Sequence, residues 1–346
     1  MSKKALIAMS GGVDSSVAAL LMKNAGYECV GAMMRLWGGA NEQDEKDAAS
    51  VAARLDMPFY VFDLQKQFKE KVIRKFISVY ESGATPNPCL DCNRYLKFGA
   101  LYEKAAELGC DVIATGHYVT CVREGGTGRY LIQKAADPAK DQSYVLYSLS
   151  QEILSHCVFP LGAYTKSEIR ELAQENGFVN SSKKESQDIC FVPDGDYAAF
   201  IERETGKVYP PGDFVTVTGE KVGTHSGIIR YTIGQRKGLG VSYKTPLYVC
   251  KKDMKNNRVI LTQGAELFSK EVTAADINLI AVPKIEGEMR VLARTRYNMK
   301  EQPATAYQPD DNTLKVVFDT PQRAAAPGQA LVLYSGNTVV GGGTII

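Results

Sequence analysis

A short run of small and polar residues near the start of the chain, Ser10-Gly11-Gly12-Val13-Asp14-Ser15, has the composition of a phosphate-binding turn. Two glycines let the backbone curl until successive N–H groups point inward, and the N-terminus of a following helix adds partial positive charge. Asp14 would stand beside the phosphates, so the pattern calls for a magnesium ion between them. A Walker P-loop carries a lysine in its motif, and none follows here. The run indicates another type of nucleotide chemistry; the alternative is a tight turn that happens to hold two glycines.

Two more nucleotide-site candidates, Met34 and Gly116, stand at the ends of predicted strands. Ligands of open parallel sheets bind at the carboxyl ends of the strands, which favours an adenosine pocket there. The alternative for Met34 is core packing, and Gly116 could be an ordinary turn glycine. The predicted nucleotide-binding residues are Ala8, Met9, Ser10, Gly11, Gly12, Val13, Asp14, Ser15, Met34 and Gly116.

Cysteines form the second group of residues able to do chemistry. Cys89 and Cys92 make a Cys-x-x-Cys pair within residues 83–93, where two prolines predict a stiff, irregular loop. Cys190 lies in a polar stretch, residues 181–193, whose lack of apolar periodicity predicts a mobile loop. In a long cytosolic chain, clustered cysteines indicate metal binding or redox catalysis more often than a disulfide framework.

The elements that must position these residues alternate between strand and helix in the first half of the chain. Apolar runs predict strands at 4–9, 28–34, 59–62 and 112–115, separated by helices. This order predicts a doubly wound parallel sheet. Short β-prone runs divided by Gly and Pro follow from about residue 205 and predict two small β-rich, barrel-like units. The predicted domains are a nucleotide-binding catalytic domain at 1–200, a central β domain at 201–267 and a C-terminal β-barrel domain at 268–346.

Bulk properties narrow the class of protein. The chain has 346 residues, 45% of them hydrophobic, and a formal net charge of +2. No apolar run approaches the roughly 20 residues that a membrane-spanning helix needs. The first predicted strand starts within a few residues of Met1, which leaves no room for a signal peptide and favours a cytoplasmic protein. The small net charge neither requires nor excludes nucleic acid as a partner.

Several separated motifs closely resemble the bacterial tRNA-specific 2-thiouridylase family, a branch of the PP-loop ATP pyrophosphatases. They begin with the Ser-Gly-Gly-x-Asp-Ser run and continue at residues 87–93, 115–118, 140–144, 186–191, 231–240, 321–323 and 327–329. The resemblance implies ATP-dependent 2-thiolation of the wobble uridine of tRNA, with Mg²⁺ as cofactor. ATP adenylylates the uridine carbonyl, which makes AMP a leaving group, and sulfur then replaces the oxygen.

Roles for individual residues follow from the same resemblance. Cys190 would carry a persulfide and Cys92 would release the sulfur by thiol exchange, which forms a disulfide. A sulfur donor such as a cysteine desulfurase or a sulfur-relay protein is implied as a partner. The residues implied to contact tRNA are His117, Lys140, Asp141, Gln142, Arg296, Tyr297 and Gln329. For any one of these the alternative is an ordinary solvated or structural position.

One position departs from the commoner family pattern. Many members have Asn-Pro-Asp-x-x-Cys-Asn, and here Cys89 replaces the aspartate, so an acid–base role for that residue is in doubt; Asp91 is the neighbouring substitute. Cys89, Cys92 and Cys190 together could ligate a [4Fe–4S] cluster that performs the thiolation in place of a persulfide relay. Two other readings stay open: a PP-loop synthetase acting on a small molecule, and a tRNA-binding module with a decayed active site.

Overall fold

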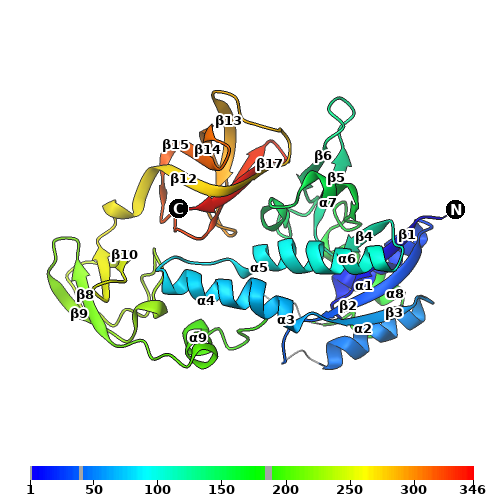
Figure 1. The fold of residues 1–346 in the computed structure, drawn as a ribbon, viewed down its shortest axis with the longest axis horizontal. Helices are drawn as coiled ribbons and strands as arrows, with labels where there is room; N and C mark the ends of the chain where they lie inside the picture. The colour runs from blue at the N-terminus through cyan, green and yellow to red at the C-terminus, as the bar shows by residue number, and fades with distance from the viewer. Residues whose placement is uncertain (1, 39–41, 184–188) are drawn as a thin grey trace.

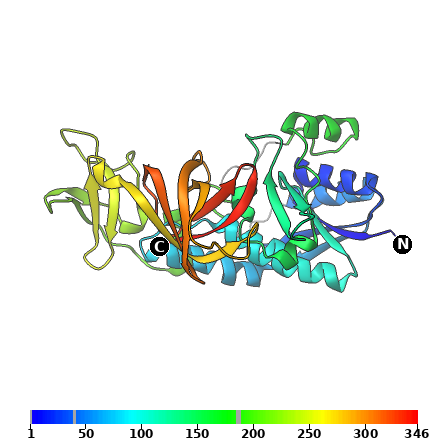
Figure 2. The same cartoon turned by 90° about the horizontal axis from the view of Figure 1, so that it is seen from above.

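The computed structural model describes residues 2–38, 42–183 and 189–346 and is elongated (Figures 1 and 2). An α/β part that contains the N-terminus lies at one end and a small central β part lies at the other (Figure 1). The C-terminal barrel lies between them, beside the long helices that run from one end towards the other (Figures 1 and 2).

The α/β part is built on a five-stranded parallel sheet in the order β3-β2-β1-β4-β7. This confirms the predicted fold class. Its strands are β1 (Lys4–Ala8), β2 (Glu28–Arg35), β3 (Phe59–Asp63), β4 (Val112–Thr115) and β7 (Cys157–Val158). The first four match the predicted runs, and the two-residue β7 was not predicted.

Both faces of this sheet are covered, as its nearly continuous apolar strands require. In β1, Ala5 and Ile7 enter one core cluster, with α1 (Val13–Asn24) and α2 (Glu42–Arg54), and Leu6 enters a second on the opposite face. The shorter helical elements here are η3 (Ser143–Leu146), α7 (Gln151–Ser155) and α8 (Lys166–Glu175). A capping box at Thr165 begins α8.

Two long helices each contain a π-helical stretch. One runs through α3 (Gln65–Phe68), η1 (Lys69–Ile73) and α4 (Arg74–Glu81), and the other through α5 (Pro88–Asp91), η2 (Cys92–Ala100) and α6 (Leu101–Glu107). The second helix corrects part of the prediction of a stiff, irregular loop at 83–93: residues 84–87 are irregular, and residues 88–93 are helical. Pro88 occupies the first turn, where its missing N–H is no loss, and the Asn87 side chain caps the helix by accepting from the Cys89 N–H at 3.2 Å.

The central β part is a four-stranded sheet in the order β10-β11-β8-β9, entered through α9 (Tyr197–Thr205). Its elements are β8 (Gly212–Thr216), β9 (Lys221–His225), η4 (Ile228–Arg230), β10 (Tyr248–Asp253) and β11 (Arg258–Thr262). Its apolar residues share a core cluster with Phe68, Phe76 and Tyr80 of the first long helix. This shared core fixes the central part against the end of that helix.

The C-terminal part is a barrel of six antiparallel strands, closed by pairing of its first and last strands. A short 3₁₀ turn, η5 (Ala265–Leu267), leads into it. Its strands are β12 (Phe268–Leu279), β13 (Met289–Arg294), β14 (Gln302–Asp310), β15 (Thr313–Arg323), β16 (Ala330–Ser335) and β17 (Thr338–Ile345). A hairpin of the α/β part, β5 (Val119–Arg123) and β6 (Tyr130–Lys134), adds to the barrel sheet where Gln133 pairs with Thr338. Among the described residues, no helix has the length and apolar character needed to cross a membrane.

Candidate active site

The phosphate-binding turn lies between β1 and α1, at the carboxyl edge of the sheet, as predicted. Gly11 has φ +72°, and a Cβ there would stand 2.7 Å from the Asp44 Cα of α2, so both the backbone conformation and the space require glycine. Gly12 is the N-cap of α1, and its carbonyl accepts from the Ser15 and Ser16 hydroxyls at 3.0 Å each. The first N–H groups of α1 lack partners within the helix and are donors for an anion.

Not every predicted nucleotide-binding residue presents its side chain to this turn. Met9 and Val13 are buried in the core, so only their backbone is available to a ligand. Ala8 ends β1. The exposed Ser10 forms a hydrogen bond with Ser15, their Oγ atoms lying 3.3 Å apart. Gly116 gives room to protein backbone, because a Cβ there would come within 2.9 Å of the Ser15 nitrogen.

Asp14 is neutralised by a lysine from another part of the chain. Its Oδ1 accepts from Lys166 Nζ at 2.6 Å and from the Tyr118 hydroxyl at 2.7 Å. Lys166 is the first residue of α8, and its side chain is 13% exposed. Sequence reasoning noted the missing lysine and did not find Lys166, although the capping box at Thr165 marks the helix end that presents it.

Two further side chains hold the turn from behind. Asn180 donates to the Gly11 carbonyl and to the Ser16 hydroxyl, both at 2.9 Å. Lys183 donates to the same carbonyl at 3.1 Å and forms ion pairs with Asp44 and Asp47 of α2. The stretch that leads towards Cys190 is therefore anchored to the phosphate-binding turn; the motif residues 186–188 lie outside the described residues, so the mobile-loop prediction stays untested there.

A cavity of about 250 Å³ opens at the carboxyl ends of β2 and β3. Met34 lines it, together with Met33, Val61 and Trp37, the single tryptophan of the chain. Arg35, Glu42, Glu45 and Gln65 also line the cavity, so its wall offers apolar side chains to an adenine ring and polar groups to the ring edge or the ribose. Met34 is half-buried, and its part in nucleotide binding stays a prediction.

Three thiols form the second half of the site. Charge on Cys89 or Cys190 raises the pKa of Cys92, and charge on Cys89 raises that of Cys190, so the three thiols act on one another electrostatically. Burial raises the pKa of the Cys92 thiol to about 12, and it also raises those of Cys89 and Cys190. Cys89 and Cys190 are nevertheless exposed to solvent, so reagents can reach both thiols.

Lys97 supplies the positive charge that opposes this effect on all three thiols. It follows Cys92 by five residues within η2, and the i→i+5 turn of a π-helix brings these two positions together. Its Nζ lies 3.4 Å from His117 Nε2, and His117 Nδ1 lies 2.7 Å from the Thr115 hydroxyl. Burial, with the Lys97 charge, holds the pKa of His117 well below its usual value, so the ring is neutral and its Nε2 accepts from Lys97.

The residues expected to contact tRNA are mostly engaged within the protein. His117 is buried, and Asp141 is buried with its carboxylate bonded to Ser143 Oγ at 2.8 Å. Gln142 accepts from the Tyr118 N–H at 2.9 Å, and the Lys140 N–H bonds the Asp137 carbonyl at 3.1 Å. These residues build the turn beside the site, and their contact with tRNA stays a prediction.

The three predicted contacts in the barrel are arranged differently from one another. Arg296 donates to the Ile233 carbonyl of the central part at 2.7 Å, and burial lowers its pKa. Gln329 donates to the Thr85 and Pro86 carbonyls at 2.9 and 3.1 Å. Tyr297 is 39% exposed, and its hydroxyl donates to the Asp141 carbonyl at 3.4 Å. Charge on Cys89 contributes to the raised pKa of Tyr297, after burial and the charge of Asp141. Of these three, Tyr297 offers the most accessible surface for stacking on a base.

Two observations bear on metals and on other cavities. Among the described residues, no three His, Cys, Asp or Glu side chains are arranged to hold a metal ion, and the eight cysteines are free thiols. Asp91 is buried and paired with Lys75 at 2.7 Å.

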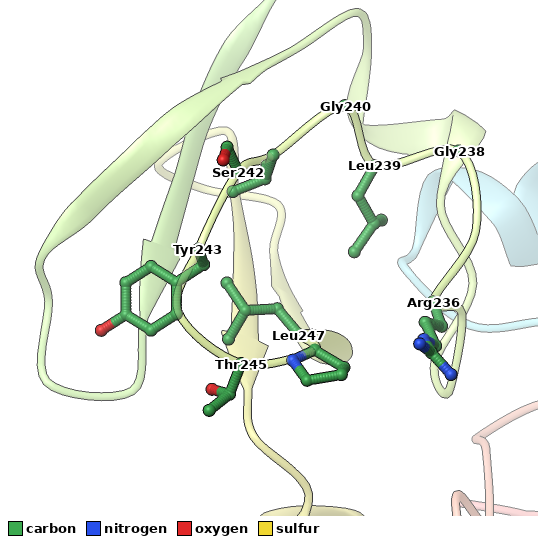
Figure 3. Close-up of a pocket in the computed structure, with 10 residues that line it drawn as sticks. Arg236, Gly238, Leu239, Gly240, Ser242, Tyr243, Thr245 and Leu247 are labelled. Atoms are coloured by element: carbon green, nitrogen blue, oxygen red, sulfur yellow. The ribbon is translucent and has the colours of Figure 1, made fainter.

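A cavity of about 630 Å³ lies inside the loop 236–247 of the central part, away from the thiols; Figure 3 shows Arg236, Ser242, Tyr243 and Thr245 around it.

Comparisons with known proteins cover the whole chain. Family models match at residues 3–194 (tRNA methyl transferase HUP domain), 198–263 (tRNA methyl transferase PRC-barrel domain) and 269–345 (Aminomethyltransferase beta-barrel domain). The chain is 45% identical to a tRNA-specific 2-thiouridylase of Clostridioides difficile, over 100% of this chain and 98% of that protein. It is 46% identical to the protein of the same name in Acetivibrio thermocellus, over 99% of both chains.

Proposed function

The chain belongs to the family of tRNA-specific 2-thiouridylases, and we propose that it catalyses ATP-dependent 2-thiolation of the wobble uridine of tRNA. One observation of the structure carries this function: three consecutive residues after β4 touch both halves of the site. Gly116 packs on the backbone of Asp14 and Ser15, His117 holds Lys97 among the thiols, and Tyr118 bonds Asp14. Nucleotide activation and sulfur chemistry therefore share one framework.

The first half-reaction uses the phosphate-binding turn. We propose that the N–H groups at the start of α1 and the Ser10 and Ser15 hydroxyls bind the ATP phosphates, and that Asp14 holds Mg²⁺. Bound MgATP supplies the adenylyl group for the uridine oxygen. Lys166 and Tyr118 fix the Asp14 carboxylate at 2.6 and 2.7 Å, so this ligand is oriented before the metal arrives.

The second half-reaction uses the thiols. The terminal persulfide sulfur on Cys190 attacks C2 of the ring, a C–S bond forms, and AMP leaves with the electrons of the C–O bond. The Cys92 thiolate then attacks Sγ of Cys190, the old S–S bond breaks, and its electron pair stays on the ring sulfur as the thiocarbonyl. A Cys92–Cys190 disulfide results, which an external dithiol must reduce. Lys97 stabilises the Cys92 thiolate by its charge.

The partners follow from the same chemistry. A persulfide on Cys190 requires a donor such as a cysteine desulfurase or a sulfur-relay protein, and the exposed surface of Cys190 supports its access. We also propose the cytoplasm as the location, because the substrate tRNA is used there. The family model at residues 3–194 is named for a tRNA methyl transferase, but the proposed mechanism includes no methyl transfer. The full-length relatives are named tRNA-specific 2-thiouridylases.

A [4Fe–4S] cluster on Cys89, Cys92 and Cys190 is the alternative sulfur chemistry. Charge on Cys89 and Cys190 raises the pKa of Cys92, and this electrostatic coupling of the three thiols favours the cluster. Among the described residues no three side chains are arranged to hold a metal ion, which favours the persulfide relay. Iron and sulfide analysis of anaerobically purified protein decides between them: iron-free protein that thiolates tRNA with a persulfide donor supports the relay. Brown, iron-containing protein that loses both iron and activity on Cys89→Asp exchange supports the cluster.

The experiment that tests the proposed function measures AMP formation with and without unmodified tRNA. We expect AMP to form only when tRNA is present, and Asp14→Ala to abolish it. A small-molecule synthetase would leave AMP formation independent of tRNA, and a decayed binding module would bind tRNA and form no AMP under any condition.

A further inference from the structure

The turn between β15 and β16 of the barrel is bound to the segment that precedes the Cys89–Cys92 helix. The Thr85 N–H donates to the Pro327 carbonyl at 2.8 Å. In return, the Gln329 amide nitrogen donates to the Thr85 and Pro86 carbonyls at 2.9 and 3.1 Å. Three hydrogen bonds thus join stretches about 240 residues apart in the sequence.

Gly328, in the middle of this turn, fits against the segment because it has no side chain. A Cβ there would lie 2.9 Å from the Thr85 carbonyl oxygen, 3.0 Å from Val79 Cγ1 and 3.2 Å from Ala84 Cβ. Its φ of +87° is also a conformation that favours glycine. Any other residue must push the turn and the segment apart.

The contact lies directly before the thiols. Thr85 and Pro86 lead into Asn87, whose side chain caps the helix at the Cys89 N–H. Pro86 and Pro88 have fixed φ angles, so a displacement at Thr85 passes with little loss to the start of the helix. Cys92 is one turn further along.

The barrel itself has a fixed position against the α/β part. The buried Tyr144 hydroxyl donates to the Ala330 carbonyl at 2.8 Å, and the Asn278 amide donates to the Tyr147 carbonyl at 2.7 Å. Arg94 of η2 forms an ion pair with Asp276 of β12 at 2.7 Å. The turn at 327–329 is therefore held by a rigid support and can act as a reference point for the segment.

We propose that the 327–329 turn positions the helix start that carries Cys89 and Cys92, so that the C-terminal barrel is a working part of the sulfur-transfer site. This rests on the proposed function for its catalytic consequence. Gly328 and Gln329 are positioning residues: they touch the backbone before the thiols and no reacting atom. A tRNA contact at Gln329 would act on the same turn, and tRNA binding would then bear directly on the placement of Cys92.

The test compares Gly328→Ala with Gly336→Ala. Both glycines have positive φ, but a Cβ at Gly336 meets no atom within 4 Å, so Gly336→Ala carries the backbone strain without the clash. Hydrogen exchange of residues 83–93 is measured in the protein without ATP or tRNA. We expect the Thr85 amide to exchange at least about tenfold faster in Gly328→Ala and unchanged in Gly336→Ala.

Steady-state thiolation then separates positioning from tRNA binding. We expect Gly328→Ala to lower kcat by about 10- to 100-fold, as small misplacement of reacting groups does, with KM for tRNA within about twofold. Gln329→Met removes both side-chain bonds at nearly constant size and should show the same pattern more weakly; it decides the matter if Gly328→Ala folds poorly. Raised KM with unchanged exchange and kcat would overturn the proposal in favour of a simple tRNA contact. Because hydrogen exchange is measured without substrates, it tests the positioning of residues 83–93 even if the protein shows no thiolation activity.

Discussion

At the scale of single residues, Lys97 is the side chain that most changes the chemistry available to the thiols. Burial raises the pKa of all three, and a thiol with a pKa of about 12 has little thiolate at neutral pH. Lys97 opposes that effect from one π-helical turn away and is held by the neutral His117. Cys89 adds a third thiol on which the same cation acts.

A prediction for Lys97→Met follows. Loss of the ammonium raises the pKa of Cys92, and at any pH below that pKa the thiolate fraction falls about tenfold for each unit of the rise. Alkylation of Cys92 by iodoacetamide, followed by mass spectrometry from pH 7 to 10, should become slower with its pH profile displaced upward. Lys97→Arg, which keeps the charge, should recover most of the rate. An unchanged profile in Lys97→Met would show that this charge does not act on Cys92.

His117 gives a second prediction, on stability. Its pKa is about 6.5 in the unfolded chain and well below that in the folded protein. Above pH 6.5 the ring is neutral in both states and has no effect; below it, only the unfolded chain takes up the proton, so folding stability falls by about 1.4 kcal/mol per pH unit. Thermal unfolding between pH 7 and 5 should show a shallower decline for His117→Asn. An equally steep decline would mean that other groups control acid sensitivity.

At the scale of elements, the first four parallel strands and the β-rich character of the chain after about residue 205 could be predicted, because the apolar period and the turn residues directly reflect burial. The start of the Cys89–Cys92 helix is not predicted, because two prolines in a short stretch indicate a break, although proline suits the first helical turn. Lys97 could not be predicted beside Cys92, because a spacing of five residues brings two side chains together only in a π-helix, and the sequence gives no sign of a π-helix here.

Other site residues could not be found locally at all. Lys166 and Tyr118 meet Asp14 across 152 and 104 residues, and only the assembled sheet and α8 bring them there. The predicted domain boundaries near 200 and 268 stay predictions. They do not convey that the hairpin β5–β6, which lies within the first predicted domain, adds to the barrel sheet.

At the scale of the whole molecule, the barrel and the α/β part share one hydrophobic cluster. Barrel residues such as Ile280, Val332 and Tyr334 are buried with Ile132 and Tyr144. Each fully buried side chain of this size contributes about 1.5–3 kcal/mol. The barrel therefore stabilises the part that holds the nucleotide site as well as contributing its own surface.

A truncated chain, residues 1–267, tests this dependence. We expect its melting temperature to fall by at least about 10 °C and its exposed core to bind a hydrophobic dye, with weakened ATP binding as a result. The full chain is the control. A truncated protein as stable as the full chain, with ATP affinity intact, would show that the barrel is an independent appendage.

We propose that sulfur passes from Cys190 to tRNA and that Cys92 releases it. The most direct measurement loads Cys190 with a ³⁵S-labelled persulfide and adds ATP and unmodified tRNA in a single turnover. We predict that the label moves to the wobble 2-thiouridine while a Cys92–Cys190 disulfide forms in equal amount. In Cys92→Ser, AMP should still form while sulfur is not released as free 2-thiouridine. Label that stays on Cys190 in the wild-type protein, while 2-thiouridine forms from another sulfur source, would contradict the account.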